Sequence, residues 1–176
     1  MMTLNELNRA NSYLYYTDKG VIHNYLDTYD KLFTPYRFKR VNIFEVGYQH
    51  GGSCKLWERY FPEAMIRSID IDNCVPEPVS SRIRVDIMDA NDLTADYFSD
   101  FPPDIAIDDG SHLIDDQLRF AKMMLPVINP GGLLIVEDIQ NLAKDKRKFK
   151  RLGHPFMVVD LRKSGRYDDV LIIFKK

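Results

Sequence analysis

The chain has 176 residues, of which 45% are hydrophobic and 28% are charged, and its formal net charge at pH 7 is −2. This length and composition are typical of one globular domain with its own core, and they argue against a disordered chain. The small negative charge argues against a dedicated nucleic-acid-binding protein, because affinity for a phosphate backbone comes from clustered Lys and Arg. No apolar run approaches the roughly 20 residues that cross a bilayer.

The expected location in the cell follows from the cysteines and from the N-terminus. Cys54 and Cys74 lack the spacing of zinc ligands, so we expect reduced thiols of the kind found in cytoplasmic proteins. No signal peptide is recognisable. The basic run at residues 144–151 has helical composition and is interpreted as a solvated helix face. We therefore expect a cytoplasmic protein without a membrane or nucleic-acid partner.

Residues 1–40 are expected to form a helical segment that caps the rest of the chain. Residues 2–16 favour a first helix, and residues 23–33 carry apolar and aromatic residues at helical spacing up to Pro35. We interpret the tyrosines of this segment as helix residues that pack onto a sheet, with lining of a sugar- or ring-binding cleft as the alternative. They are Tyr13, Tyr15, Tyr16, Tyr25, Tyr29 and Tyr36.

Residues 41–176 alternate between strand and helix patterns and are expected to form the main domain. Five predicted strands are each followed by a turn or a helical stretch: residues 41–46, 64–71, 82–87, 104–107 and 133–136. The last apolar runs, residues 156–161 and 170–174, are joined by a linker too short for a parallel crossover, which indicates an antiparallel hairpin. The pattern predicts an α/β fold with a doubly wound, Rossmann-like sheet of seven strands. This sheet would be mostly parallel and would bind ligands at the carboxyl ends of its strands.

A glycine-rich turn follows the first predicted strand and opens a helix. Glu45 lies near the end of the strand, and Gly47, Gly51 and Ser53 belong to the turn. Glycine lets the backbone adopt a positive φ and approach a ligand closely. Because the spacing departs from the G-x-G-x-x-G dinucleotide fingerprint, the turn favours a cofactor site without identifying the cofactor. An ordinary tight turn is the alternative.

An acidic residue ends the second predicted strand about 20 residues after the glycine turn, where such a side chain typically binds ribose hydroxyls. Asp70 has this position and Asp72 is the alternative candidate, with a solvated loop acid as the other interpretation. After the third strand, Asp86 or Asp89 either faces an adenine amino group or caps a helix. The turn and these acids indicate a nucleoside-containing cofactor. The lack of a second phosphate-binding loop and the final hairpin favour a methyl donor over NAD.

Two acidic motifs follow the fourth and fifth predicted strands. The first is residues 108–112 (DDGSH), and the second is the pair Glu137 and Asp138. If the two strands are parallel neighbours, the four carboxylates meet at one edge of the sheet, where Mg²⁺ would relieve their repulsion. His112 is then a candidate base, kept neutral by the cation and by a helix N-terminus. The alternatives are helix caps for Asp108 or Asp138 and a structural surface role for His112.

These motifs resemble those of class I S-adenosylmethionine-dependent methyltransferases. More narrowly, they are similar to the metal-dependent O-methyltransferases that act on macrolide sugars, with cephalosporin hydroxylase-like proteins as relatives. The matching segments are residues 17–20 (TDKG) with His23 and Tyr25, 44–47 (FEVG), Trp57 with 60–62 (YFP), 69–72 (IDID), 108–112 (DDGSH), 130–132 (PGG) and 136–140 (VEDIQ).

The resemblance implies roles for individual residues. Asp109, Glu137 and Asp138 would bind Mg²⁺, His112 would be the general base beside Asp109, and residues 17–19 would fold over the site. The residues expected to hold S-adenosylmethionine, from the resemblance together with the turn and the strand ends, are Glu45, Gly47, Gly51, Ser53, Asp70, Asp72, Asp89 and Asp108.

The expected function is Mg²⁺-dependent transfer of a methyl group from S-adenosylmethionine to a hydroxyl of a sugar or sugar-containing metabolite. A methyltransferase for catechol-like or other small vicinal diols is the second enzymatic interpretation. A non-catalytic nucleotide-binding scaffold and a Rossmann dehydrogenase are two further interpretations. The chain is shorter than the macrolide enzymes and is expected to lack their additional N-terminal domain. Since a second subunit would complete its cleft, we also consider a homo-oligomer.

Overall fold

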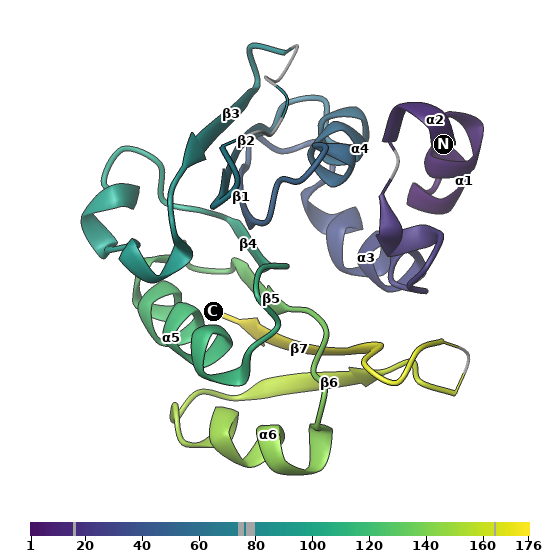
Figure 1. The fold of residues 1–176 in the computed structure, drawn as a ribbon. Coiled ribbons are helices and arrows are strands. Elements are labelled where there is room, and N and C mark those ends of the chain that lie inside the picture. Colours follow the sequence, from purple (N-terminus) through teal and green to yellow (C-terminus); the bar gives the residue numbers. More distant parts are fainter. Residues whose placement is uncertain (16, 74–75, 77–79, 164) are drawn as a thin grey trace.

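The computed structural model describes residues 1–15, 17–73, 76, 80–163 and 165–176. A seven-stranded sheet runs through the centre of this part, with the strand order β3-β2-β1-β4-β5-β7-β6 (Figure 1). The strands are β1 (Asn42–Val46), β2 (Met65–Asp70), β3 (Ile83–Ile87), β4 (Ile105–Asp108), β5 (Leu133–Val136), β6 (Phe156–Asp160) and β7 (Val170–Lys175).

The sheet has the predicted mixed character. Neighbouring strands from β3 to β5 are parallel, whereas β7 runs antiparallel to both β5 and β6. The predicted C-terminal hairpin is therefore confirmed, with β7 on the inside and β6 at the edge of the sheet. The strand order reverses between β1 and β4, and ligands of doubly wound sheets bind at such a switch point.

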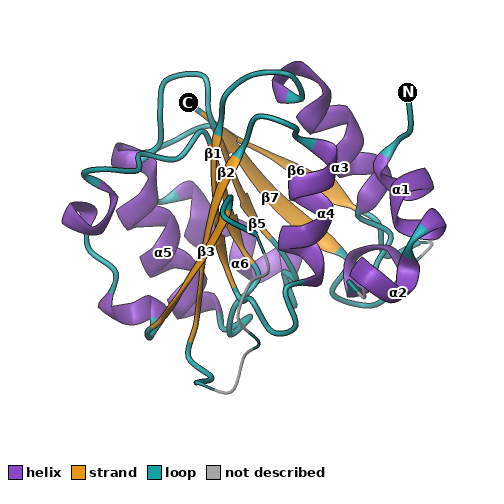
Figure 2. Cartoon of the chain, turned by 90° about the horizontal axis from the view of Figure 1, so that it is seen from above, coloured by secondary structure: helices purple, strands orange, loops and turns teal. Residues whose placement is uncertain are grey.

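Helices cover both faces of the sheet. Figure 2 shows α1 to α4 on one face and α5 on the other, and α6 contacts α5. The helices are α1 (Leu4–Ala10), α2 (Ser12–Tyr15), α3 (Leu26–Phe33), α4 (Gly52–Tyr60), α5 (Ile114–Val127) and α6 (Leu142–Lys150). The prediction of one helix at residues 2–16 is wrong, because the backbone leaves the helical region at Asn11 (φ −142°, ψ 43°). The described residues between β2 and β3 form no helix, so the predicted alternation is incomplete there.

Both faces of the central strands are buried, as is typical of a parallel sheet. Ile43 and Ile107 belong to a core formed with α1, α3 and α4, whereas Phe44, Val46 and Ala106 belong to a second core formed with α5. Successive side chains of a strand point to opposite faces, so an uninterrupted apolar run serves both cores at once. This explains why the sequence shows short apolar runs rather than alternation at these strands.

The carboxyl ends of β1, β4 and β5 lie side by side. Val46 pairs with Asp108, and Asp108 pairs with Val136. The next residues continue this row, since the Asp109 N–H donates to the Val46 carbonyl over 3.1 Å and the Glu137 N–H donates to the Asp108 carbonyl over 3.0 Å. The prediction that the two acidic motifs follow neighbouring parallel strands is therefore confirmed.

Two glycines allow close approaches in the turn between β1 and α4. Gly47 has a φ of +93°, and a Cβ atom there would overlap the carbonyl oxygen of Asp109. Gly51 has a φ of +70° and is the N-cap of α4, and a Cβ atom there would overlap the ring of Tyr48. The glycine-rich turn thus brings the end of β1 against the end of β4.

The tyrosines of the N-terminal segment divide into buried and exposed residues. Tyr15, Tyr25 and Tyr29 are buried in the core, which confirms the predicted packing for these three. Tyr13 is 79% exposed, so the packing prediction is wrong for this residue, because the single turn of α2 directs it to solvent. The prediction about Tyr16 lies outside the described residues.

The basic run lies on α6 and is a solvated helix face, as predicted. Its exposed side chains include Lys144, Lys146, Arg147 and Lys150. Cys54 is a buried free cysteine, and Cys74 lies outside the described residues. None of the helices in the described part of the chain is long and apolar enough to cross a membrane.

Candidate functional site

A cavity of about 430 Å³ opens at the carboxyl ends of β1, β2 and β4. Asp109 and His112, the predicted catalytic residues, line it, and so do Thr17 and Asp18 of the N-terminal segment. Five of the residues predicted to bind a cofactor also line it: Gly47, Ser53, Asp70, Asp89 and Asp108. The fold therefore gathers most of the predicted cofactor residues next to the residues predicted for the chemistry.

Three predicted cofactor residues lie outside the lining of this cavity. Glu45 is fully buried and faces α4, where the Trp57 indole N–H donates to its Oε2 over 2.8 Å. Gly51 is the N-cap of α4. The Asp72 N–H donates to Asp70 Oδ1 over 3.0 Å. These three residues support the elements that carry the lining.

Asp70 and Asp89 hold backbone groups with their carboxylates. Asp70 Oδ2 accepts hydrogen bonds from the N–H groups of Tyr48 at 2.9 Å and Gln49 at 2.7 Å, which fixes the glycine-rich turn. Asp89 Oδ1 accepts from the Asn91 N–H over 2.8 Å and caps a short 3₁₀ turn, so the capping interpretation is confirmed for Asp89. Both acids shape the cavity wall through these contacts.

Lys19 lies at the centre of the carboxylate cluster. Its ammonium nitrogen is 2.5 Å from Asp109 Oδ2, 2.8 Å from Glu137 Oε1 and 3.4 Å from Glu45 Oε1. Burial opposes the charge on this side chain, but the three carboxylates outweigh burial and hold the pKa of Lys19 well above its usual value. Lys19 is therefore a permanent cation inside an acidic site.

Burial and Lys19 act in opposite directions on the neighbouring carboxyl groups. Burial raises the pKa of Glu137 well above its usual value and raises the pKa of Asp108 to about 7. Burial also opposes the ionisation of Asp109, but Lys19 and His112 outweigh it and lower the pKa of Asp109. Asp109 is therefore the carboxylate of this group that stays ionised most readily.

Two buried tyrosines donate to the second acidic motif. The Tyr25 hydroxyl donates to Asp138 Oδ1 over 2.5 Å, and the Tyr29 hydroxyl donates to Glu137 Oε1. Tyr29 lies on α3, and Tyr25 is the N-cap residue of the same helix. With Lys19, they place three polar groups of the N-terminal segment against the ends of β4 and β5. The N-terminal segment therefore holds the acidic motifs in place.

His112 lies between the two acidic motifs. Its Nε2 is 3.4 Å from Asp109 Oδ1, and its Nδ1 is 3.3 Å from Asp138 Oδ2. The hydrogen bond with Asp109 raises the pKa of His112 above its usual value. The neutral imidazole expected from the sequence is therefore a state that a bound cation would have to impose.

Asp108 and Asp138 do not cap the helices that follow them. The N-cap positions of α5 and α6 are Leu113 and Asn141. Asp108 Oδ1 instead accepts from the Gly110 N–H over 3.4 Å, and Asp138 Oδ1 accepts from the Tyr25 hydroxyl. The capping interpretation is wrong for both residues because the chain continues for several residues beyond each strand before a helix begins.

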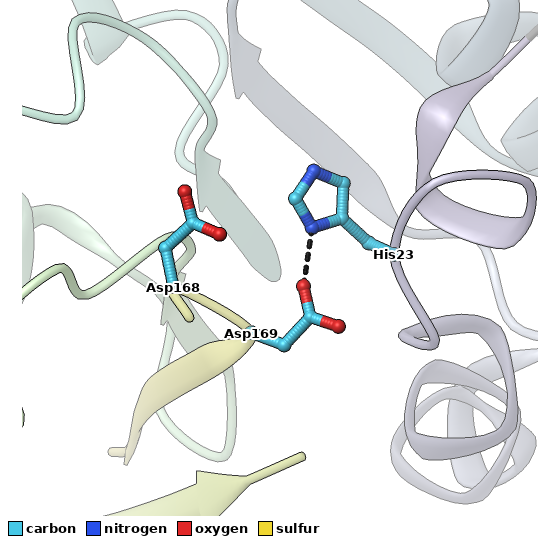
Figure 3. A group of neighbouring side chains, drawn as sticks. All are labelled: His23, Asp168 and Asp169. Atoms are coloured by element: carbon cyan, nitrogen blue, oxygen red, sulfur yellow. Dashed lines mark hydrogen bonds and ion pairs between the residues drawn. The ribbon is translucent and has the colours of Figure 1, made fainter. Parts of the chain in front are cut away.

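A third acidic pair, Asp168 and Asp169, lies at the amino end of β7 (Figure 3). His23 Nδ1 is 2.6 Å from Asp169 Oδ1 and 3.7 Å from Asp138 Oδ1. The Asp168 carbonyl accepts from the Tyr25 hydroxyl over 3.4 Å. Because β7 is antiparallel to β5, the amino end of β7 lies beside the carboxyl ends of β4 and β5. An acidic pair directly before the last apolar run is the sequence signal that was missed.

The donor atoms of this site fit a divalent cation. Asp109, His112 and Asp138 each offer one ligand atom, and these atoms lie within 4.8 Å of one another. Glu137, the third predicted metal ligand, precedes Asp138 in the chain, and its Oε1 accepts a hydrogen bond from the Lys19 ammonium. Hard cations such as Mg²⁺ prefer such carboxylate oxygens. The structure thus brings two of the predicted metal ligands, Asp109 and Asp138, together with the predicted base, and it places the third, Glu137, against Lys19.

Two relatives of the chain are O-methyltransferases of Streptomyces. The chain is 34% identical over 133 residues to the 8-demethyl-8-alpha-L-rhamnosyl tetracenomycin-C 2'-O-methyltransferase of Streptomyces olivaceus, which is 70% of this chain and 35% of that protein. It is 35% identical over 150 residues to the demethylmacrocin O-methyltransferase of Streptomyces fradiae, which is 77% of this chain and 36% of that protein. The chain thus spans about a third of the length of these relatives. No protein-family model matches the chain.

Solved structures show a similar fold. The MycE methyltransferase of the mycinamycin pathway, in a structure with Mg, S-adenosylhomocysteine and mycinamycin VI, matches 99% of this chain and 54% of its own chain. The TM-score is 0.74 and the sequence identity is 26%. Sequence and fold together make this chain a homologue of the sugar O-methyltransferases of macrolide biosynthesis, within the class I S-adenosylmethionine-dependent methyltransferases.

Proposed function

We propose that this chain carries the site of an S-adenosylmethionine-dependent O-methyltransferase that requires a divalent cation and acts on a sugar hydroxyl. The observation that carries the proposal is the position of His112, which lies between Asp109 and Asp138 in the wall of the cavity that the predicted cofactor residues line. The relatives support the substrate class, since one name specifies 2'-O-methylation of a rhamnosyl tetracenomycin and the other specifies O-methylation of demethylmacrocin.

The cavity suits a nucleoside-containing methyl donor. Gly47 lets the backbone come close to a ligand, and the Asp70 carboxylate lies in the wall, where it offers an acceptor for ribose hydroxyls. S-adenosylmethionine, when bound, supplies an electrophilic methyl group. The MycE structure with S-adenosylhomocysteine supports this choice of cofactor.

The acidic cluster suits activation of an acceptor hydroxyl. Asp109, Glu137 and Asp138 would hold a divalent cation, which when bound favours ionisation of the hydroxyl. His112 would take the proton of the hydroxyl on a ring nitrogen. Lys19 and the buried tyrosine hydroxyls hold the carboxylates in place, so the base and the acceptor would be aligned before the reaction begins.

The first test is a calorimetric titration of S-adenosylhomocysteine into metal-stripped protein, with and without Mg²⁺. NAD⁺ is the control ligand. We expect S-adenosylhomocysteine to bind and NAD⁺ to give no heat of binding. Binding of NAD⁺ alone would favour the dehydrogenase interpretation and refute the proposal. No binding of either ligand would also refute the proposal, because the proposed methyl transfer requires that the cavity bind the methyl donor.

A transfer assay with labelled S-adenosylmethionine tests the acceptor and the metal. We expect methyl transfer to rhamnosides and related deoxysugar conjugates, loss of transfer in EDTA and recovery with Mg²⁺. Transfer to catechol without transfer to any sugar would favour the vicinal-diol interpretation. Full turnover by protein shown to be metal-free would refute the cation requirement. The cytoplasmic location and the homo-oligomer stay predictions, and light scattering after gel filtration measures the latter.

A further inference from the structure

Three carboxylates surround the buried Lys19 ammonium inside the acidic site. Oxygen atoms of Asp109, Glu137 and Glu45 lie 2.5, 2.8 and 3.4 Å from its nitrogen. Buried carboxylates repel one another unless a cation lies between them, and hard divalent cations prefer such oxygen groups. In this chain the cation at the centre of the three oxygens is a side chain.

The position of this ammonium adjoins the proposed cation site, because the two share Asp109. Asp109 Oδ2 contacts Lys19, whereas Asp109 Oδ1 faces His112 Nε2 at 3.4 Å. A carboxylate shared by two neighbouring cations is a feature of two-metal sites, in which the ions lie about 3.5–4 Å apart. Lys19 therefore contacts one oxygen of Asp109, and the other oxygen faces the proposed cation site.

The surrounding structure holds Lys19 in this position. The residue belongs to the 3₁₀ turn Asp18–Gly20, and its side chain is 1% exposed. Its carbonyl accepts from the Tyr25 N–H over 3.0 Å, which ties the turn to the start of α3. The other donors on the three carboxylates include the Tyr29 hydroxyl and the Trp57 indole, and both are neutral. Lys19 therefore supplies full positive charge where these two donors supply none.

We infer that Lys19 takes the place of a second divalent cation and so limits the acidic cluster to one. The inference rests on the proposed function, because it presumes a divalent cation at Asp109 and Asp138. Lys19 is in addition a positioning residue, since its contacts hold Asp109 and Glu137 together without an exchangeable ion.

The test counts Mn²⁺ ions bound per chain by electron paramagnetic resonance in metal-stripped protein. We expect one ion in the wild type and two in Lys19→Ala, because this variant leaves three carboxylates around an open space. The second ion should broaden the signal of the first by magnetic coupling. Lys19→Met fills the space without charge and should bind one ion. Lys31→Ala, which changes an exposed lysine of α3, is the matched control and should also bind one ion.

The outcomes decide the inference separately from the proposed function. One Mn²⁺ in folded Lys19→Ala, bound as in the wild type, would overturn the role of Lys19 and leave the function intact. If Lys19→Ala does not fold without metal, it is refolded in Mn²⁺, and two ions then support the inference, whereas one ion or no folding overturns it. A wild type that binds no Mn²⁺ would refute the cation requirement and would also overturn the inference that Lys19 limits the cluster to one ion.

Discussion

His112 and Asp138 face each other with both backbones in the left-handed region. His112 Nδ1 lies 3.3 Å from Asp138 Oδ2, and the φ angles of the two residues are +57° and +55°. Such a conformation costs a non-glycine residue on the order of 1–3 kcal/mol, so the surrounding packing must hold it. The orientation of the proposed base is therefore built into the backbone at the ends of β4 and β5.

Replacement of His112 tests its role as the base. We expect His112→Ala to lower kcat by roughly 10²- to 10⁴-fold, the usual contribution of a positioned general base, with little change in the affinity for S-adenosylhomocysteine. His154→Ala, which changes an exposed histidine outside the site, should retain wild-type turnover. Near-wild-type turnover of His112→Ala between pH 6 and 9 would exclude this role.

The buried carboxyl of Asp108 should make the stability of the metal-free protein depend on pH. Burial raises the pKa of its carboxyl to about 7, above the value of about 3.9 in an unfolded chain, so the folded state retains a proton that the unfolded state releases. The protonated Asp108 carboxyl therefore stabilises the folded state fully below about pH 4. This stabilisation is lost as the pH rises to about 7. In EDTA, Asp108→Asn should therefore be more stable than the wild type at pH 8, by at most roughly 4 kcal/mol.

Urea unfolding of the metal-free wild type and of Asp108→Asn between pH 5 and 8 measures this difference. Asp96→Asn, which changes an exposed carboxyl, is the control and should follow the wild type. The stability advantage of Asp108→Asn should grow as the pH rises. A constant difference across this range would mean that Asp108 does not titrate there.

The Tyr25 hydroxyl should stabilise the metal site through Asp138. Tyr25→Phe removes the donor to Asp138 Oδ1 and leaves a buried carboxylate oxygen without it, which should cost about 1–3 kcal/mol of unfolding free energy. Loss of such a supporting contact should also weaken Mn²⁺ binding by about 10- to 100-fold. Tyr13→Phe, at an exposed position, should change neither property. Equal Mn²⁺ affinity in both variants would argue that Tyr25 only fills space.

Gly47 should be required for the contact between the ends of β1 and β4. Gly47→Ala combines a positive φ with an overlap between Cβ and the Asp109 carbonyl, whereas Gly131→Ala has a similar φ of +80° in open space. We expect both to lose stability, on the order of 1–3 kcal/mol for the backbone alone, and Gly47→Ala to lose more. Calorimetry should show weaker S-adenosylhomocysteine binding in Gly47→Ala alone. Equal losses of stability with unchanged binding would contradict the importance of the close approach.

The central sheet was predictable because local patterns determine it. Apolar runs separated by turns indicate strands, and a short linker before the last run indicates the hairpin. The two acidic motifs could be placed together because parallel neighbours end at the same edge of a sheet. The missed break at Asn11 reflects a weaker signal, since residues 2–16 contain no Gly or Pro to mark it.

The side chains that support the acidic motifs could not be placed from the sequence. Lys19 meets Glu137 across 118 positions of the chain, and His23 meets Asp169 across 146. Such contacts depend on how the N-terminal segment docks and on the direction of β7, and no local pattern encodes either. The helical spacing of Tyr25 and Tyr29 correctly indicated that the two side chains are buried. It did not indicate that their hydroxyls donate hydrogen bonds to carboxylates.

The position of β7 late in the chain also has a consequence for folding during synthesis on the ribosome. Asp169, which binds His23, is made 146 residues after it. A nascent chain can pair β1, β2, β3, β4 and β5 before β7 has left the ribosome. The acidic edge of that intermediate would lack its third pair of carboxylates and the partner of His23, so the complete site can form only after β7 has been made.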